Sequence, residues 1–218
     1  MALARFLQFS DLHLGRPFGR LPAEVREARW RDQQRVLEKA VEEAIHRRVH
    51  AILVPGDLFD AIGVEIGLLQ FAIQTFAQDG CPPVYIAPGN HDPVTALSPA
   101  WNPRLLEARR LAWPAHVHVF DQPHWTSHEV PGLPGVRVWG RCFVANVESA
   151  ERPLAAAMLT GVEAPAPDGL AIAVFHGSRE GSCPPSQKVT APFSDAEVEA
   201  SPFTYHAVGH YHAGSRLT

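Results

Sequence analysis

The stretch Val84-Tyr85-Ile86-Ala87-Pro88-Gly89-Asn90-His91-Asp92 runs from an apolar segment directly into a group of polar side chains. The apolar segment Val84–Ala87 is typical of a buried strand. After it, Asn90 offers a metal an amide oxygen, His91 suits proton transfer, and Asp92 suits orienting the His91 imidazole. The alternative is a polar turn before Pro93. We interpret the stretch as a strand that ends at a metal-binding or catalytic site.

The same arrangement, an apolar run followed by Asp or His, occurs at four other places along the chain. Asp11 and His13 follow Leu3–Phe9, Asp57 follows Ala51–Val54, His176 follows Leu170–Phe175, and His210 and His212 follow Tyr205–Val208. Each pattern alone has an ordinary explanation, such as a helix cap, a tight turn, a core histidine or a surface strand. Their occurrence together, each at the end of a predicted strand, favours one shared site, because sites in α/β proteins lie at the carboxyl ends of strands.

These residue types define the chemistry of the predicted site. Asp, Asn and His suit borderline and hard divalent ions such as Mn²⁺, Fe²⁺ and Zn²⁺. The candidate ligands are Asp11, His13, Asp57, Asn90, His176, His210 and His212. Seven ligands with a central carboxylate are enough for two adjacent metals. A two-metal site activates a water and holds the attacking and leaving oxygens of phosphoryl transfer.

Strand-like and helix-like segments alternate along the chain, which predicts an α/β layered fold. Further strands are expected at Val117–Phe120 and Val136–Phe143. Helices are expected from after Pro22 to about Val49, at Glu65–Gln78 and at Ser149–Thr160. The later strands are more closely spaced, which indicates mixed or antiparallel pairing in that part of the chain.

Length and composition limit the class of protein. The chain has 218 residues and a formal net charge of -4, which fits one sizeable domain and argues against a generally basic nucleic-acid coat. The three cysteines form no CxxC pair, so we expect a reducing cytoplasm rather than a disulfide framework. The first motif begins too early to leave room for a signal peptide, and no apolar run approaches the ~20 residues of a membrane span.

The sequence leaves the roles of several polar residues undecided. Asp60 is either a cap or a ligand. Arg16 and the arginines that follow it up to Arg31 either contact phosphates or form a solvated helix face. The pair His116 and His118 lies inside a strand pattern, and we interpret it as a solvent-facing strand edge.

The order of motifs from Asp11 to His212 resembles that of the calcineurin-like metallophosphoesterases. The pattern D-x-H, G-D, G-N-H-D, H and G-H-x-H spans nearly the whole chain. The flanking segments Phe9-Ser10-Asp11-Leu12-His13-Leu14-Gly15-Arg16 and Leu53-Val54-Pro55-Gly56-Asp57-Leu58-Phe59-Asp60 resemble the SbcD-type DNA repair exonucleases. In bacteria such exonucleases partner an SbcC-type ATPase.

The resemblance implies a four-layer α/β/β/α sandwich of two mixed sheets and a centre of two divalent metal ions, Mn²⁺ before Fe²⁺ or Zn²⁺. One metal would be held by Asp11, His13, Asp57 and His212. The other would be held by Asp57, Asn90, His176 and His210, with Asp57 bridging. His91 would be the general acid or transition-state stabiliser, oriented by Asp92, and Arg16 would contact substrate phosphate.

Family members usually continue with further strands after the last motif and often with a DNA-capping region. We therefore expect residues 1–218 to be one nuclease domain, truncated at its C-terminus. The favoured function is a DNA exonuclease or endonuclease in DNA repair, with DNA, an SbcC-type ATPase and a second copy of the chain as partners. A phosphoesterase for a nucleotide or phosphoprotein is the alternative, which the net charge of -4 keeps open. A non-catalytic scaffold is disfavoured because every ligand is present.

Overall fold

The computed structural model describes residues 4–182 and 188–212. The strands are β1 (Phe6–Gln8), β2 (Ala51–Val54), β3 (Val84–Ile86), β4 (Val117–Val119), β5 (Thr126–Glu129), β6 (Val136–Gly140), β7 (Leu170–His176) and β8 (Tyr205–Gly209). The helices are α1 (Ala23–His46), α2 (Ile66–Phe76), α3 (Pro103–Ala108) and α4 (Asp195–Ala200), with a 3₁₀ turn at Ala156–Leu159. Within the described residues, no helix is both long and apolar enough to cross a membrane.

The strands form two four-stranded sheets, in the orders β1-β2-β3-β4 and β5-β6-β7-β8. All neighbours in the first sheet are parallel. In the second sheet β5 is antiparallel to β6, whereas β6, β7 and β8 are parallel. The α/β fold with two sheets is confirmed, and the mixed pairing is confined to the second sheet.

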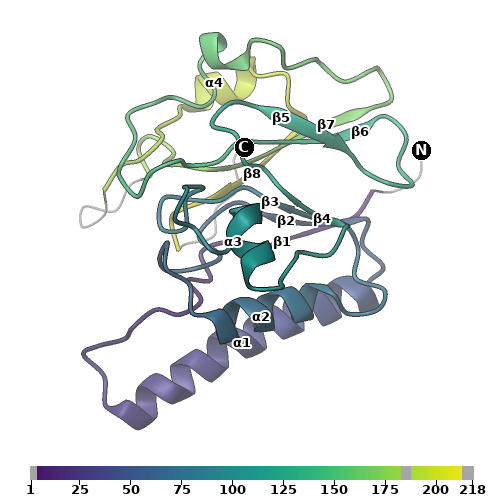
Figure 1. Cartoon of the computed structure of the whole chain (residues 1–218). Coiled ribbons are helices and arrows are strands. Elements are labelled where there is room, and N and C mark those ends of the chain that lie inside the picture. Colours follow the sequence, from purple (N-terminus) through teal and green to yellow (C-terminus); the bar gives the residue numbers. More distant parts are fainter. Residues whose placement is uncertain (1–3, 183–187, 213–218) are drawn as a thin grey trace.

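The layers follow from the alternation of side chains along the strands. In β2, Ile52 and Val54 pack in the core beneath α1 and α2, whereas Ala51 and Leu53 face the second sheet. The far side of the second sheet is covered by the segment around α4, where Phe175 packs with Phe193 and other apolar residues. Figure 1 shows the resulting order of helices, sheet, sheet and helix. This arrangement is the predicted four-layer sandwich.

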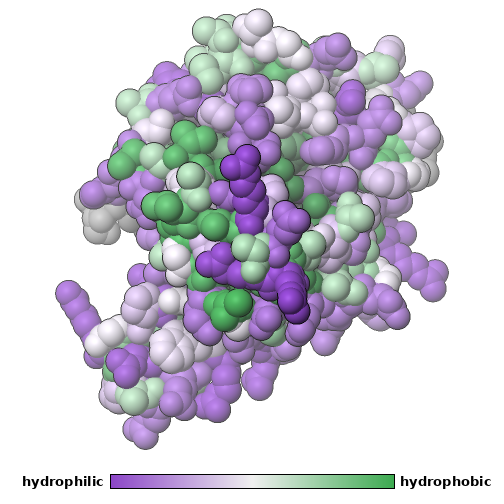
Figure 2. All heavy atoms as spheres, viewed as in Figure 1, coloured by the Kyte–Doolittle hydropathy of each residue, from purple (hydrophilic) through white to green (hydrophobic). Residues whose placement is uncertain are grey.

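Helix α1 packs through a narrow apolar stripe. Its buried residues Leu37, Val41 and Ala44 recur at helical spacing and join the core with α2. Figure 1 shows the N-terminal end of α1 extending beyond α2, and Figure 2 shows mostly hydrophilic residues along α1 on this face. The stripe therefore fixes the helix to the first sheet while much of its length stays in contact with solvent.

Two predictions about local structure are wrong. The helix expected at Ser149–Thr160 is reduced to the 3₁₀ turn, because Pro153 lacks an N–H and keeps the residue before it out of helical geometry. His118 does not face solvent on the edge strand β4. Its ring stacks on Tyr85, with centroids 5.0 Å apart, because β5 and the second sheet cover this end of β4.

Candidate metal centre

The predicted site residues come together at the carboxyl ends of β1, β2, β3, β7 and β8. They surround a cavity of about 710 Å³. Its wall includes six of the predicted residues, namely His13, Asp57, Asn90, His91, His210 and His212, together with Arg16. Asp11 and His176 lie behind them and contact Asp57 or His212. Both sheets thus contribute to a single site.

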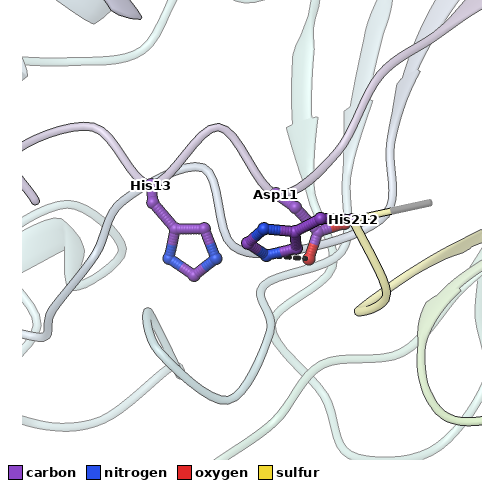
Figure 3. A group of neighbouring side chains, drawn as sticks. All are labelled: Asp11, His13 and His212. Carbon is purple, nitrogen blue, oxygen red and sulfur yellow. Dashed lines mark ion pairs between the residues drawn. The ribbon is translucent and has the colours of Figure 1, made fainter. Parts of the chain in front are cut away.

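The first group of potential ligands is Asp11, His13 and His212. One ligand atom from each lies within 4.8 Å of the others. Figure 3 shows the His212 imidazole beside the Asp11 carboxylate, with Nε2 of His212 3.8 Å from Oδ1 of Asp11. Nε2 of His13 lies 3.6 Å from Oδ2 of Asp57. The four residues expected to hold the first metal are therefore neighbours.

The second group consists of Asp11, Asp57 and His176, again with ligand atoms within 4.8 Å of one another. Nε2 of His176 lies 3.2 Å from Oδ2 of Asp57. The His210 ring lies 5.1 Å from the His176 ring, but Nε2 of His210 faces the Lys188 carbonyl at 3.1 Å. His210 thus lies beside the group, with only its Nδ1 available to a metal.

The backbone is strained at four of the candidate ligand residues. Asp11, His13, Asp57 and His210 all have positive φ, at 55°, 48°, 52° and 120°. Such conformations are unfavourable for residues with a Cβ and persist only where surrounding contacts hold them. Here the loops brace each other, since the Asp11 amide donates to the Gly56 carbonyl and the His13 amide donates to the Asp57 carbonyl.

Two glycines allow the ligand loops to approach one another. A Cβ added to Gly56 would lie 2.3 Å from Nδ1 of His176. A Cβ added to Gly89 would lie 2.3 Å from Oδ1 of Asp57. No other residue fits at these positions unless a ligand moves, so the Gly-Asp and Gly-Asn-His-Asp motifs carry glycine for steric reasons.

The Asp57 carboxylate and the His176 imidazole stabilise each other's charged forms. Burial opposes ionisation of Asp57, but the nearby charges of His176 and His13 hold the pKa of its carboxyl well below its usual range. Burial likewise disfavours the charged form of His176, yet Asp57 and Asp11 raise the pKa of its imidazole to about 9. The two side chains thus form a buried ion pair in which a proton occupies the place that a cation would take.

Unpartnered polar atoms show that the residues fit metal ions. Among residues 4–182 and 188–212, the buried Oδ1 of Asn90 has no hydrogen-bond partner, and Nε2 of His176 has only its ion pair with Asp57. Buried polar atoms are nearly always paired, and these two are an amide oxygen and an imidazole nitrogen that divalent cations accept. Asp11, His13, Asp57 and His212 add carboxylate and imidazole donors. The set would hold two divalent cations around Asp57.

The prediction that Asp92 orients His91 is wrong. The buried Asp92 carboxylate accepts hydrogen bonds from the Gly89 amide at 2.8 Å and the Phe59 amide at 3.1 Å. Nδ1 of His91 faces the Asp60 carbonyl instead, at 3.1 Å. The tight turn at Gly89 directs the carboxylate back onto its own loop, so Asp92 joins the two ligand loops rather than contacting the imidazole.

Asp60 occupies the position that was expected of Asp92. Its Oδ1 lies 3.0 Å from Nδ1 of His13 and 4.0 Å from Nδ1 of His91. Because its carbonyl also faces His91, Asp60 contacts both histidines and is neither a helix cap nor an isolated loop residue. Its place three residues after Asp57 was the only sequence signal for this role.

Cationic side chains surround the mouth of the cavity. Arg16, Arg20 and Lys188 all contribute to its wall. Lys188 was missed in the sequence, and it pairs with Glu148 at 2.6 Å. The two arginines are exposed and have no ion pair among the described residues, so they are available to an anionic group.

Comparison with known families agrees with this geometry. The family of calcineurin-like phosphoesterases matches residues 4–214. The chain belongs to the calcineurin-like phosphoesterase family. No curated protein matches it significantly. Family membership and the Asp/His groups together imply metal-dependent phosphoester hydrolysis at a candidate dinuclear site.

Proposed function

We propose that this phosphoesterase hydrolyses phosphodiester bonds of DNA with two Mn²⁺ ions, as a nuclease of the SbcD type. The observation that carries the proposal is the pairing of two ligand groups that share Asp11, with Asp57 in contact with His13 and His176, beside a cavity whose wall includes Arg16 and Arg20. When bound, the metals supply an activated water and stabilise charge on the phosphoryl oxygens. The segments around Asp11 and Asp57 support the nuclease over other members of the family.

His91 is the residue suited to proton transfer. The Asp60 carbonyl can only accept a hydrogen bond, so Nδ1 of His91 carries a proton and Nε2 is the atom that remains for the substrate. The His91 side chain is 44% exposed, unlike the buried ligands. From this position, protonated His91 would give its Nε2 proton to the leaving oxygen.

The cations at the mouth bind the substrate. Arginine guanidinium groups match phosphate oxygens with two parallel hydrogen bonds. Arg16 and Arg20 would hold the phosphates next to the scissile bond. The scissile bond itself would then lie beside the candidate metal ligands in the same cavity. The chain as a whole has a net charge of -4, so the attraction to DNA would be confined to the surface around Arg16 and Arg20.

A phosphoesterase for a small substrate is the second candidate. The cavity of about 710 Å³ lies within the range of roughly 300–1,000 Å³ that is typical of small-molecule sites. A nucleotide would fill such a cavity without further contacts outside it. For the nuclease, we propose an SbcC-type ATPase and a second copy of the chain as partners. The free thiols of Cys81 and Cys142 support a reducing compartment such as the cytoplasm.

Parallel assays of the Mn²⁺-loaded protein test these candidates. Linear DNA, a nucleoside monophosphate and bis(4-nitrophenyl) phosphate would each be incubated with wild type and with His91→Ala. We expect wild type to degrade DNA and the diester, and the variant to lose both activities. Rapid turnover of the nucleotide with intact DNA would replace the nuclease with the small-substrate enzyme. Metal binding without any turnover would favour a scaffold.

A further inference from the structure

The loop that carries Asp11 and His13 is held from outside the site by helix α1. The side-chain amide of Gln33 donates to two successive carbonyls of this loop, Leu12 at 3.0 Å and His13 at 2.7 Å. Gln33 lies in the middle of α1 and is half-buried. One side chain, distant from these residues in sequence, therefore holds the peptide groups on both sides of His13.

The loop needs such support because its conformation is unfavourable. Asp11 and His13 both have positive φ, and Leu12 lies between them. The His13 carbonyl also accepts from the Arg16 amide at 3.1 Å, whereas among the described residues no backbone amide donates to the Leu12 carbonyl, and such carbonyls require donors from elsewhere. The –NH₂ group of glutamine has two N–H bonds, so it can satisfy both carbonyls at once.

We propose that Gln33 is a positioning residue for the metal centre, which sets the orientation of His13. The inference rests on the proposed two-metal function. Removing a group that contacts a metal ligand and fixes its orientation typically alters metal affinity by about 10–100-fold. Because Gln33 contacts the loop of Asp11 and His13, its loss should weaken the ion held by these residues and His212. The ion at Asp57 and His176 should be weakened less, because Asp11 is the only member of that group on this loop.

A second contact from α1 provides a matched control. Nε1 of Trp30 donates to the Arg16 carbonyl at 2.6 Å, so it joins the same helix to the same loop. Arg16 lies beyond the ligands, however, and its carbonyl does not adjoin His13. If α1 acts only as general packing for the loop, Trp30→Phe and Gln33 variants should have similar effects. If Gln33 positions the ligand, only its own variants should change metal binding.

The decisive variant is Gln33→Glu. Glutamate has nearly the same shape, but its carboxylate would face two carbonyl oxygens without a hydrogen to donate. Gln34→Glu introduces the same charge one residue further along α1, where no hydrogen bond to the loop exists among the described residues. Gln33→Met removes the donors without adding charge, and it serves if the glutamate variant does not fold.

Mn²⁺ binding to the full chain would be measured by calorimetry and electron paramagnetic resonance, and thermal unfolding would be recorded without metal. We expect Gln33→Glu and Gln33→Met to weaken one of two Mn²⁺ ions by about 10–100-fold. Gln34→Glu and Trp30→Phe should bind both ions as wild type does. Wild-type affinity in both Gln33 variants, or an equal loss in Trp30→Phe, would overturn the inference. Wild type that binds a single ion would contradict the proposed two-metal function, and the affinity of that ion would still test Gln33.

Discussion

Oδ1 of Asp60 lies 3.0 Å from Nδ1 of His13, while the Asp60 carbonyl lies 3.1 Å from Nδ1 of His91. One residue thus contacts a candidate metal ligand through its side chain and the candidate general acid through its backbone. A carboxylate beside a ligand imidazole fixes its tautomer and makes the other nitrogen a better donor to a metal.

Asp60→Ala should therefore weaken metal binding and reduce phosphodiester hydrolysis, each by about 10–100-fold. Asp60→Asn should have a smaller effect, because it removes the charge beside Nδ1 of His13 but keeps a polar side chain of the same size there. Metal titration and turnover on the same preparations would check this. Unchanged metal affinity in Asp60→Ala would show that the contact with His13 has no bearing on the centre.

Asp57 should be required for both metals, since it lies in contact with His13 on one side and His176 on the other. Mn²⁺-soaked crystals of wild type should show two anomalous peaks about 3.5–4 Å apart, both beside Asp57. Asp57→Ala should lose both peaks, whereas His212→Ala should lose one. A single peak in fully occupied wild-type crystals would contradict the dinuclear site.

His91→Ala should keep the metals but lower hydrolysis on the order of 10²–10⁴-fold, the range for a group that transfers a proton. The reason is that His91 is the more exposed of the two histidines grouped with Asp60 and belongs to neither of the two groups that contain Asp11. Metal content and turnover should be measured on one sample. Loss of a metal would make His91 a ligand, and full activity would remove it from the mechanism.

Arg16→Glu should weaken DNA binding and reduce its salt dependence, because phosphate contacts release counterions. Hydrolysis of bis(4-nitrophenyl) phosphate should change little, since Arg16 lines the mouth of the cavity rather than the ligand groups. Arg104→Glu on α3 is a matched control, an exposed arginine outside the cavity wall. Equal effects of the two substitutions would indicate a general charge effect and no specific contact at Arg16.

Acid should destabilise the fold partly through His206. Burial lowers the pKa of His206 to about 4, so the folded state favours its neutral form. The unfolded chain binds the proton at a pKa of about 6.5, so this contribution is complete above about pH 6.5 and is lost as the pH falls towards 4. His206→Asn should flatten the loss of unfolding free energy over this window in metal-free protein. The exposed His124→Asn should retain the wild-type slope, and an unchanged slope in His206→Asn would contradict the prediction.

The sequence was most informative where apolar runs end in polar motifs. Strand β2 matches its predicted bounds, because its four residues are all buried, His50 precedes them and Pro55-Gly56 follows them. In contrast, β5 was missed because Thr126–Glu129 has no apolar pattern, and its pairing with β6 alone makes it a strand. Secondary structure could thus be predicted for buried strands but not for a polar edge strand.

The sequence likewise predicted which residues gather at the site, but not which residue contacts His91. The positions of Asp11, Asp57 and His176 next to one another follow from strand ends, which a linear pattern contains. The partner of His91 does not, because it depends on how the Gly89 turn directs Asp92 and on where the loop after Asp57 places Asp60. Lys188 likewise reaches the cavity from a loop that carries no motif.

The candidate ligands are divided between the two sheets, with Asp11, His13, Asp57 and Asn90 from the first half of the chain and His176, His210 and His212 from the second. A chain still being synthesised cannot assemble the centre until β8 has been made and has paired with β7. Ions that bind only the assembled form stabilise it by mass action and link the two sheets, so that neither can separate without releasing metal. Metal binding would then add to the apolar packing that already joins the two sheets, so that the stability of the pair would depend on the concentration of the ion.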